Sequence, residues 1–405
     1  MPPLIFYFPF PSAGGVSVLF LRIAEKLSRL GECTLVDLPD GFMARNCPPS
    51  VRLWSALDRN PYPPDGIFIT QTCPPWRLPC FQDFPESMKL FFWNLHPDNL
   101  IASLVTGNSG RSLAQYLTPL DPLLSFARRR KLSGFLRLAV EHHGIAFMDL
   151  MNVEKTKKSL AVDFEPMLLP ICTGEAATLH RCSKKKTGLS CVWLGRLESF
   201  KTPVLLHLMN RLDAVNTFPI TLTLLGDGGD SEFLQERARR LQRLKCKFAG
   251  AVSLREIDAS LQGHDVLFAM GTSALEGARL GLPTFCLDYS HLNFEGFLRF
   301  RLLYDVRGLN LGEEIDESHK EPSSTLENTL VSIMRNHREY GDHCYEYWRK
   351  HHSLEQVSRD FINVVASSNL QTRHLVAAGL FSPDVFTQLK SRFCNASSFT
   401  GWSYC

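Results

Sequence analysis

Short apolar runs that end in a glycine, proline or polar turn, each followed by a helix-like stretch, recur along this 405-residue chain. The first run is PLIFYFPF at 3–10, and it precedes the turn PSAGG, a helix predicted over 16–30 and a second strand-like run, CTLVDL, at 33–38. A strand that returns to its own sheet through a glycine turn and a helix pairs in parallel. The alternation therefore predicts an α/β fold built on parallel sheets.

The alternation fills two halves of the chain. Further strands are predicted in the first half at 66–71, 89–96 and 144–150, and in the second half at 189–195, 220–226, 247–250, 264–270 and 283–288, with a long helix at 231–244. Between the halves, from Lys155 to Lys186, the sequence becomes basic and irregular, which is typical of a domain junction. A chain of this length with 44% hydrophobic residues is too long for one ordinary core. Two α/β domains with a cleft between them are the expected architecture.

Composition argues against several classes of function. The formal net charge of +3 is too small to suggest nucleic acid as a partner. The twelve cysteines form no Cys-x-x-Cys pair and no metal-like spacing, so reduced thiols in a cytosolic protein are expected, and no zinc site. The first 21 residues carry no charge, but prolines at 9 and 11 and glycines at 14 and 15 interrupt any membrane helix there.

Two strand ends in the second half carry residues suited to binding phosphate. In WLGRLESFK, Arg196 directly follows Gly195 at a strand end and Lys201 stands five residues later, so both cations can bind one diphosphate. In LLGDGGDSE, Gly226 belongs to a turn where backbone can approach a ligand closely. The alternatives are a solvated arginine and lysine on a loop, and a glycine turn that only reverses the chain.

The stretch GTSALEGARLGLP, 271–283, opens a helix directly after a buried strand. Gly271, Thr272 and Ser273 offer backbone amides at the positive end of the helix, where anions bind. Glu276, one turn further, is placed to accept hydrogen bonds from vicinal hydroxyls such as those of a ribose. The alternative is a capping box, in which Ser273 and Glu276 only cap their own helix. Together with the two cations, the ligand interpretation predicts a site for a nucleotide sugar.

These segments resemble motifs of GT-B fold glycosyltransferases, and of glycosyltransferase family 4 in particular. GRLESFK is similar to the family's motif of Gly-Arg-Leu followed by Lys, and LTLLGDGGDSEFL to its strand with Gly-x-Gly. FAMGTSALEGARLGLPTF resembles its signature of two glutamates eight positions apart, followed by a small residue, Gly and Pro. The turn PSAGG, with Gly14 and Gly15, resembles its amino-terminal glycine loop. The resemblance covers roughly residues 4–365.

The resemblance implies an α/β chain of two Rossmann-like domains that face each other across a cleft. It implies an acceptor-binding domain at 1–170, a nucleotide-sugar-binding domain at 185–345, and a helix at 346–366 that crosses back to the first domain. Residues 367–405 are then a tail of unknown role. The implied activity is metal-independent, retaining hexosyl transfer from a UDP- or GDP-sugar in surface or cell-wall polysaccharide synthesis, with no cofactor. The donor-binding residues expected are Gly14, Gly15, Arg196, Lys201, Gly226, Gly271, Thr272, Ser273 and Glu276.

One position departs from the family motif. Phe268 stands where the first of the two glutamates, which contacts the donor sugar in the family, is expected. A single glutamate after Gly-Thr-Ser is also found in other GT-B proteins, including nucleotide-sugar 2-epimerases. A 2-epimerase and a catalytically inactive GT-B binding module are therefore the alternative functions.

The candidate catalytic residue is His96. WNLHP places it at the end of a first-half strand, where a histidine can contact the sugar or accept a proton. The alternative is a structural histidine beside a proline. No metal is expected at the diphosphate, because cations and helix amides can stabilise the leaving group.

The segment LLSFARRRKLSGFLRLAV, 123–140, combines near-helical apolar spacing with the basic residues Arg128, Arg129, Arg130 and Lys131. Such a helix can rest on an anionic bilayer, with each cation contributing about 1 kcal/mol near the surface. This interpretation predicts a cytoplasmic protein, peripheral at the inner face of the membrane, with a lipid-linked glycan as acceptor. The alternative is an ordinary amphipathic helix with a solvated face.

Overall fold

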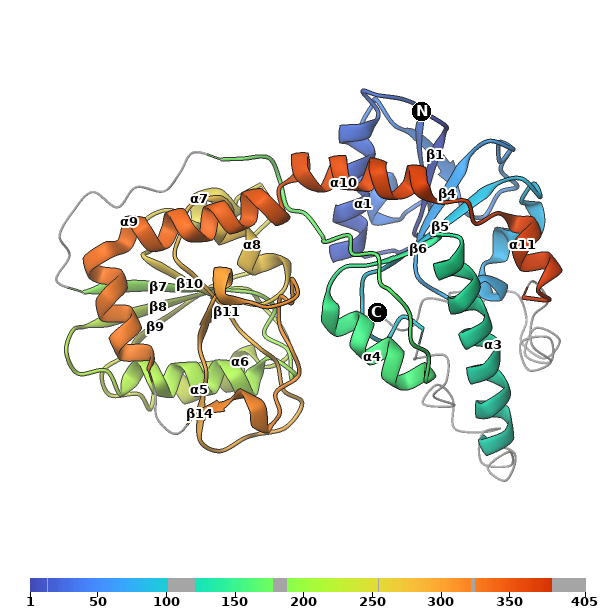
Figure 1. The fold of residues 1–405 in the computed structure, drawn as a ribbon. Coiled ribbons are helices and arrows are strands. Elements are labelled where there is room, and N and C mark those ends of the chain that lie inside the picture. The colour runs from blue at the N-terminus through green and yellow to red at the C-terminus, as the bar shows by residue number, and fades with distance from the viewer. Residues whose placement is uncertain (13, 101–120, 178–187, 254, 322–324, 381–405) are drawn as a thin grey trace. The chain divides into compact units, whose positions relative to one another are not determined.

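The computed structural model of the chain describes residues 1–12, 14–100, 121–177, 188–253, 255–321 and 325–380 (Figure 1). The chain forms two compact units. Unit 1 contains Met1–Ile171 and the described residues from Val357 onward, and unit 2 contains Cys172–Gln356. Each unit is built on a mainly parallel sheet with helices, which confirms the α/β class predicted from the sequence.

Unit 1 has the strand order of a Rossmann fold. Its strands are β1 Leu4–Tyr7, β2 Cys33–Asp37, β3 Arg52–Ser55, β4 Ile67–Gln71, β5 Lys89–Asn94 and β6 Ile145–Phe147. They pair in parallel in the order β3-β2-β1-β4-β5-β6. The order reverses between β1 and β4, which makes this the switch point of the sheet. The helices are α1 Gly15–Leu27, α2 Phe42–Arg45, α3 Asp121–Glu141, α4 Leu150–Leu160, α10 Leu354–Ser367 and α11 Thr372–Ala377.

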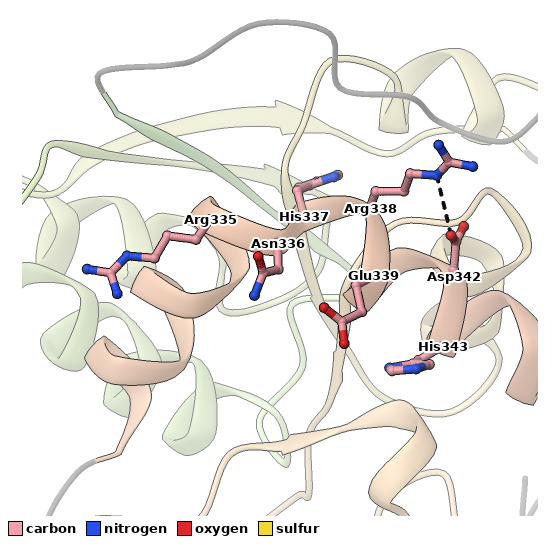
Figure 2. Close-up of a pocket in the computed structure, with 7 residues that line it drawn as sticks. All are labelled: Arg335, Asn336, His337, Arg338, Glu339, Asp342 and His343. Atoms are coloured by element: carbon pink, nitrogen blue, oxygen red, sulfur yellow. Dashed lines mark ion pairs between the residues drawn. The ribbon is translucent and has the colours of Figure 1, made fainter.

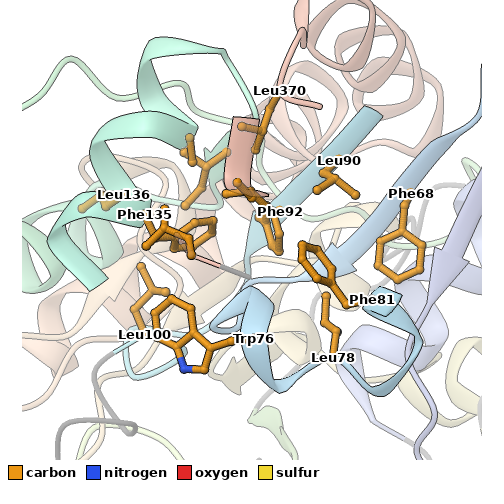
Figure 3. Packing of buried hydrophobic residues seen from close by; sticks show 14 of the residues in the cluster. Phe68, Trp76, Leu78, Phe81, Leu90, Phe92, Leu100, Phe135, Leu136 and Leu370 are labelled. Atoms are coloured by element: carbon orange, nitrogen blue, oxygen red, sulfur yellow. The ribbon is translucent and has the colours of Figure 1, made fainter. Parts of the chain in front are cut away.

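Both faces of the unit 1 sheet are covered. On one face Trp93 of β5 meets Phe361 of α10 and Phe20 of α1, with ring centroids 5.6 and 6.4 Å apart. Phe92, the preceding residue, points to the opposite face and packs on Phe135 of α3 at 4.9 Å (Figure 3). A strand buried on both faces must be apolar at successive positions. This is why the strands of this unit appear in the sequence as continuous apolar runs.

Unit 2 repeats the arrangement. Its main strands are β7 Leu189–Leu194, β8 Ile220–Leu225, β9 Lys245–Gly250, β10 Val266–Ala269, β11 Thr284–Cys286 and β13 Arg301–Leu302. Their order is β13-β11-β10-β7-β8-β9, parallel except for β13, so the switch point lies between β7 and β10. β12 Phe297–Leu298 and β14 Lys320–Glu321 form a separate small sheet. The helices are α5 Thr202–Asp213, α6 Ser231–Ala238, α7 Ile257–Leu261, α8 Thr272–Arg279 and α9 Leu326–His351.

The long helix predicted over 231–244 is wrong in its second half. α6 ends at Ala238, and the chain then turns into β9. The carboxylate of Asp213, at the end of α5, accepts hydrogen bonds from the amides of Gln242, Arg243 and Leu244 at 3.3, 2.7 and 2.8 Å. These amides are therefore bound by a side chain from another helix and do not continue α6.

The single helix predicted over 346–366 is two helices. α9 ends at His351, and α10 begins at Leu354. Between them Ser353 caps the second helix, because its hydroxyl accepts a hydrogen bond from the amide of Gln356 at 3.2 Å. The second helix belongs to unit 1 from Val357 onward.

The tail predicted from residue 367 begins with residues that complete the core of unit 1. Leu370 is fully buried, and its carbonyl accepts a hydrogen bond from the Leu90 amide at 2.8 Å (Figure 3). A side chain at Gly144 would overlap Leu370, so this glycine makes room for the returning chain. Leu375 of α11 is also buried. Residues 381–405 lie outside the described part of the chain.

Candidate functional site

The carboxyl edge of the unit 2 sheet holds most of the residues predicted to bind the donor. β7 ends at Leu194 and β10 at Ala269, and these two residues are paired in register. Arg196 and Gly271 each follow two residues later. In open α/β sheets, ligands bind outside the carboxyl ends of the strands at the switch point. The predicted phosphate-binding residues therefore lie where this topology favours a ligand.

Helix α8 begins at this edge with a backbone conformation that favours glycine. Gly271 has φ 62° and ψ −143°, a combination that residues with a Cβ rarely adopt. Its amide donates to the Leu311 carbonyl at 2.6 Å, and its carbonyl accepts from the Ala274 amide at 3.1 Å. Within the described ranges, no protein group accepts a hydrogen bond from the amides of Thr272 and Ser273. This partly exposed first turn keeps two backbone donors available to an anion.

The capping-box interpretation of Ser273 and Glu276 is wrong. The residue that precedes α8 is Gly271, and no side chain caps the helix. A capping box needs its serine at that non-helical position. Ser273 instead lies within the first turn, because the left-handed glycine starts the helix two residues earlier.

Glu276 belongs to a buried ion network. Its side chain is 7% exposed, and its Oε2 accepts a hydrogen bond from Nε of Arg279 at 3.0 Å. The same guanidinium binds the carboxylate of Asp258 in α7 and the Glu175 carbonyl. A carboxylate can be buried this deeply because the cation neutralises it. Arg279 was not predicted from the sequence, where its signal is the i, i+3 spacing of opposite charges on one helix.

Arg196 and Lys201 both lie near the end of β7, but their side chains differ in exposure to solvent. The Arg196 side chain is 73% exposed and lies 3.8 Å from the carboxylate of Glu198. Lys201 precedes α5 and is partly buried, and desolvation, helped by the charge of Arg196, lowers its pKa to about 8. A Cβ placed on Gly195 would lie 3.3 Å from Nζ of Lys201, so the ammonium sits beside the strand end. Both cations therefore lie near the carboxyl end of β7.

Gly226 and Gly228 have a packing reason to be glycine. A Cβ on Gly226 would overlap the carbonyl oxygen of Gly195, and one on Gly228 would overlap that of Leu197. The Leu197 amide also donates to the Asp227 carbonyl at 3.0 Å. The β8 turn thus packs directly against the loop that carries the predicted arginine. Its glycines position that loop, and a direct ligand contact of Gly226 stays a prediction.

Phe268 is a core residue of unit 2. It lies in β10, is fully buried, and stacks on Phe285 of β11 with ring centroids 4.8 Å apart and planes 6° apart. Its side chain therefore lies in the core and not at the exposed carboxyl edge of the sheet. The contact that the family's first glutamate makes with the donor sugar has no counterpart at this position.

The glycine loop of unit 1 lies at the switch point of its own sheet. Gly14 precedes α1 and Gly15 is its first residue, and among the described atoms none lies within 4 Å of a Cβ placed on Gly15. Asp37, at the end of β2, anchors this loop: its two carboxylate oxygens accept from the amides of Phe10 at 2.9 Å and Ala44 at 3.1 Å. Asp37 was not predicted from the sequence, where its signal is an acid at the end of a buried strand.

His96 lies in the loop two residues beyond the end of β5, not within the strand. Its Nδ1 accepts a hydrogen bond from the Asp98 amide at 3.1 Å. Desolvation lowers the pKa of His96, although 57% of its side chain is exposed. A neutral ring that accepts at Nδ1 carries its proton on Nε2. In this tautomer Nε2 can donate a hydrogen bond, and a contact of His96 with the sugar stays a prediction.

The predicted basic cluster lies on α3. Arg129 and Arg130 are exposed, Arg128 and Lys131 are partly exposed, and Nζ of Lys131 lies 4.2 Å from the centre of the Trp76 ring. On the same helix Phe126 is 66% exposed. No helix in the described part of the chain is long and apolar enough to span a bilayer.

A separate depression lies on α9 and includes none of the predicted site residues. It has a volume of about 460 Å³ and is lined in part by Asn336, where the helix bends (Figure 2). The residues that line it are Arg335, Asn336, His337, Arg338, Glu339, Asp342 and His343. Across the residues that the structure describes, no three His, Cys, Asp or Glu side chains are grouped to hold a metal ion.

Comparison with known proteins rests on structure. No family model matches the chain, and no curated protein does. Its fold is similar to a glycosyltransferase from Rickettsia africae, with a TM-score of 0.55, 11% identity, and coverage of 90% of this chain and 97% of that one. It is also similar to a TarM variant of S. aureus in complex with fondaparinux, α-GlcNAc-glycerol and UDP (TM-score 0.54, 9% identity, 90% and 100% covered).

A third similar structure is HepE of Anabaena in complex with UDP and glucose, with a TM-score of 0.51, 9% identity, and coverage of 91% of this chain and all of that one. In each case the likeness extends over both units of the chain. With the two Rossmann-type strand orders, it establishes that this chain has the GT-B fold.

Proposed function

We propose that the chain is a glycosyltransferase that moves a sugar from a nucleotide-sugar donor to a glycan or lipid-linked glycan acceptor. The observation that carries the proposal is the carboxyl edge of the unit 2 sheet. Arg196 and Lys201 follow β7 there, and the amides of Thr272 and Ser273 follow β10, the strand that pairs with β7 at the switch point. Cations and helix amides together are donors that suit the oxygens of a diphosphate.

In this proposal each group has one task. The amides at the start of α8 and the two cations hold the diphosphate, and Glu276 accepts hydrogen bonds from the ribose hydroxyls. When the sugar leaves, negative charge develops on the terminal phosphate of the nucleoside diphosphate. Arg196 and Lys201 stabilise that charge electrostatically, which supports transfer without a metal ion.

The nucleotide proposed is UDP. HepE and the TarM variant, which share the fold, were solved with UDP. TarM was solved with α-GlcNAc-glycerol as well, and HepE with glucose, which supports a hexose as the transferred group. Retention of configuration is carried over from the family 4 resemblance of GRLESFK and GTSALEGARLGLP.

Unit 1 is proposed to hold the acceptor. His96 would donate from Nε2 to the sugar or the acceptor, and Gly14 and Gly15 would leave space for a ligand at the start of α1. The exposed Phe126, Arg129 and Arg130 of α3 support attachment to an anionic membrane surface. The expected location is the cytoplasm, at the inner face of the membrane, where a lipid-linked acceptor would be reached.

The test is incubation of the full chain with UDP-, GDP- and CMP-sugars, with and without lipid-linked glycan acceptors, and measurement of the free nucleotide. Acceptor-dependent release of UDP is expected. Conversion of the donor at C2 without an acceptor would indicate the epimerase instead. Binding of UDP-sugars without turnover for any acceptor would indicate an inactive binding module.

A further inference from the structure

We infer that Arg279 is a positioning residue for Glu276 and holds its carboxylate in the orientation that meets the ribose hydroxyls of the donor. The inference rests on the proposed function, because it takes a nucleotide to bind at the start of α8. It is carried by one geometric fact. A single guanidinium joins Glu276 to two other segments of unit 2, through Asp258 and the Glu175 carbonyl.

The guanidinium nitrogens of Arg279 donate hydrogen bonds to acceptors on three segments of unit 2. Its Nε and Nη2 both lie 3.0 Å from Oε2 of Glu276. Its Nη1 lies 3.2 Å from Oδ2 of Asp258 and 3.3 Å from the Glu175 carbonyl oxygen, and Nη2 also contacts Oδ1 of Asp258. Because a guanidinium is planar and rigid, these contacts fix its rotation. The orientation of the Glu276 carboxylate is thus set from outside its own helix.

The segment that carries Glu175 is itself anchored. The Thr173 amide donates to the His352 carbonyl at 3.2 Å, and the indole of Trp348 donates to the Thr173 hydroxyl at 2.7 Å. Thr173 and Trp348 are both buried. The Glu175 carbonyl, two residues from this anchor, therefore provides a fixed acceptor for Arg279.

The network removes a cost of binding before the ligand arrives. A glutamate side chain that is not held samples several rotamers, and a ligand that needs one of them must pay for that ordering. Here the side chains of Glu276 and Arg279 are 7% and 9% exposed and already paired. The donor then meets a pre-oriented carboxylate, whose charge in the low-dielectric interior is balanced by the guanidinium.

Two variants distinguish a positioning role of Arg279 from an effect of its charge and from an effect on folding. Arg279→Lys keeps the positive charge, but one ammonium cannot replace a fork that reaches three acceptors. Asp258→Asn leaves Glu276 and Arg279 in place and weakens only the outer hold on the guanidinium. The Asp258 side chain is 42% exposed, so this change is the milder one for folding. The full chain is titrated by calorimetry with UDP, 2′-deoxy-UDP and inorganic pyrophosphate, and melting temperature is followed in parallel.

The wild-type chain should prefer UDP to 2′-deoxy-UDP, because the carboxylate binds a ribose hydroxyl. Arg279→Lys should weaken UDP binding about tenfold and abolish most of that preference, and Asp258→Asn should do so more weakly. Pyrophosphate binding should stay unchanged in both, since the cations and helix amides are intact. In the Glu276→Gln background, Arg279→Lys should have little further effect on UDP affinity.

Each contrary outcome has a separate meaning. An equal loss of UDP affinity from Arg279→Lys with and without Glu276 would show that the arginine acts on the fold, and would overturn the positioning role. An unchanged preference for UDP in both variants would also overturn it, while the proposed function stands. If the wild-type chain bound neither UDP nor pyrophosphate, the proposed nucleotide site would be wrong, and this inference would be wrong with it.

Discussion

Arg196 and Lys201 are proposed to bind the diphosphate of the donor and Glu276 its ribose, so their variants should fail differently. Arg196→Ala and Lys201→Ala should each lower UDP affinity about ten- to a hundredfold, because a hydrogen bond to a charged group is worth roughly 1.5–3 kcal/mol. Neither should change uridine binding. Glu276→Gln should weaken uridine and UDP alike.

Calorimetry with uridine and UDP, beside a melting curve for each variant, makes this comparison. Normal UDP binding by Glu276→Gln, with loss in the arginine and lysine variants, would limit the site to the phosphates. Normal binding by all three would remove it from this edge of the sheet.

The lowered pKa of Lys201, about 8, predicts how binding depends on pH. Below pH 8 the ammonium is charged and attracts the diphosphate, so UDP affinity should be nearly constant from pH 7 to just below 8. Above pH 8 the free protein holds a neutral amine, and binding must take up a proton, so affinity should fall.

The contribution of Lys201 to the stability of the fold changes with pH in the opposite direction, so unfolding cannot account for the loss of UDP affinity. A lysine pKa that is lower in the folded than in the unfolded chain makes its contribution to stability rise with pH, from about 8 up to the unfolded value of about 10.4. Lys201→Arg supplies the control, because a guanidinium stays charged throughout and should give a flat profile. A profile for this variant that matches the wild type would show that another group titrates.

At the residue scale, sequence reasoning found the residues whose positions follow from strand ends. Arg196 and Gly271 could be placed because each directly follows an apolar run. The ion pair of Glu276 could not, since two of the three partners of Arg279 come from α7 and from the segment at 172–177. The capping box failed for a local reason: Gly271 starts the helix in a conformation that the sequence does not reveal.

At the scale of elements, the start of α8 should depend on Gly271 having no side chain. A Cβ there meets open space among the described atoms, so Gly271→Ala adds backbone strain without a clash. The strain costs about 1–3 kcal/mol and is relieved if the first turn shifts and moves the Thr272 and Ser273 amides. Lower binding of both UDP and pyrophosphate is expected by calorimetry. Gly15→Ala, also in open space but without a positive φ, should change stability by about 0.5 kcal/mol or less.

The three consecutive arginines of α3 should control membrane attachment. Replacement of Arg128, Arg129 and Arg130 by Ser removes about 3 kcal/mol of attraction to an anionic surface at low salt, at roughly 1 kcal/mol per cation. Sedimentation with anionic vesicles should drop sharply, and UDP binding should stay normal. Added salt should weaken the wild-type interaction, since the charges are exposed.

The end of α6 and the turn that follows it offer a matched control for this change. Arg237, Arg239 and Arg240 are three exposed arginines on unit 2, so their replacement by Ser alters net charge equally. An equal loss of sedimentation in both triple variants would mean that net charge, not α3, binds the vesicles. No sedimentation of the wild-type chain at low salt would contradict the membrane role.

The helix boundaries that sequence reasoning placed wrongly depend on contacts between elements. α6 stops short because Asp213, from α5, binds the amides of Gln242, Arg243 and Leu244. α10 starts anew because Ser353 caps it, whereas the single helix predicted over 346–366 rests on the family resemblance. Periodicity predicts that a helix exists more reliably than where it ends.

For the whole molecule, two α/β units could be predicted because parallel strands buried on both faces leave continuous apolar runs. The return of residues 357–380 to unit 1 could not be predicted in full. Leu370 and Leu375 complete a core formed by residues more than two hundred positions away, and short segments carry no periodic signal of their own.

The central claim is that unit 2 binds a nucleoside diphosphate through cations and helix amides at its switch point. Calorimetric titration of the full chain with UDP in the presence of a chelator tests it most directly. Saturable binding without any divalent metal is expected. Binding that strictly requires magnesium or manganese would contradict binding through cations and helix amides and indicate a metal ion held by carboxylates. No binding with or without metal would contradict the nucleotide site itself.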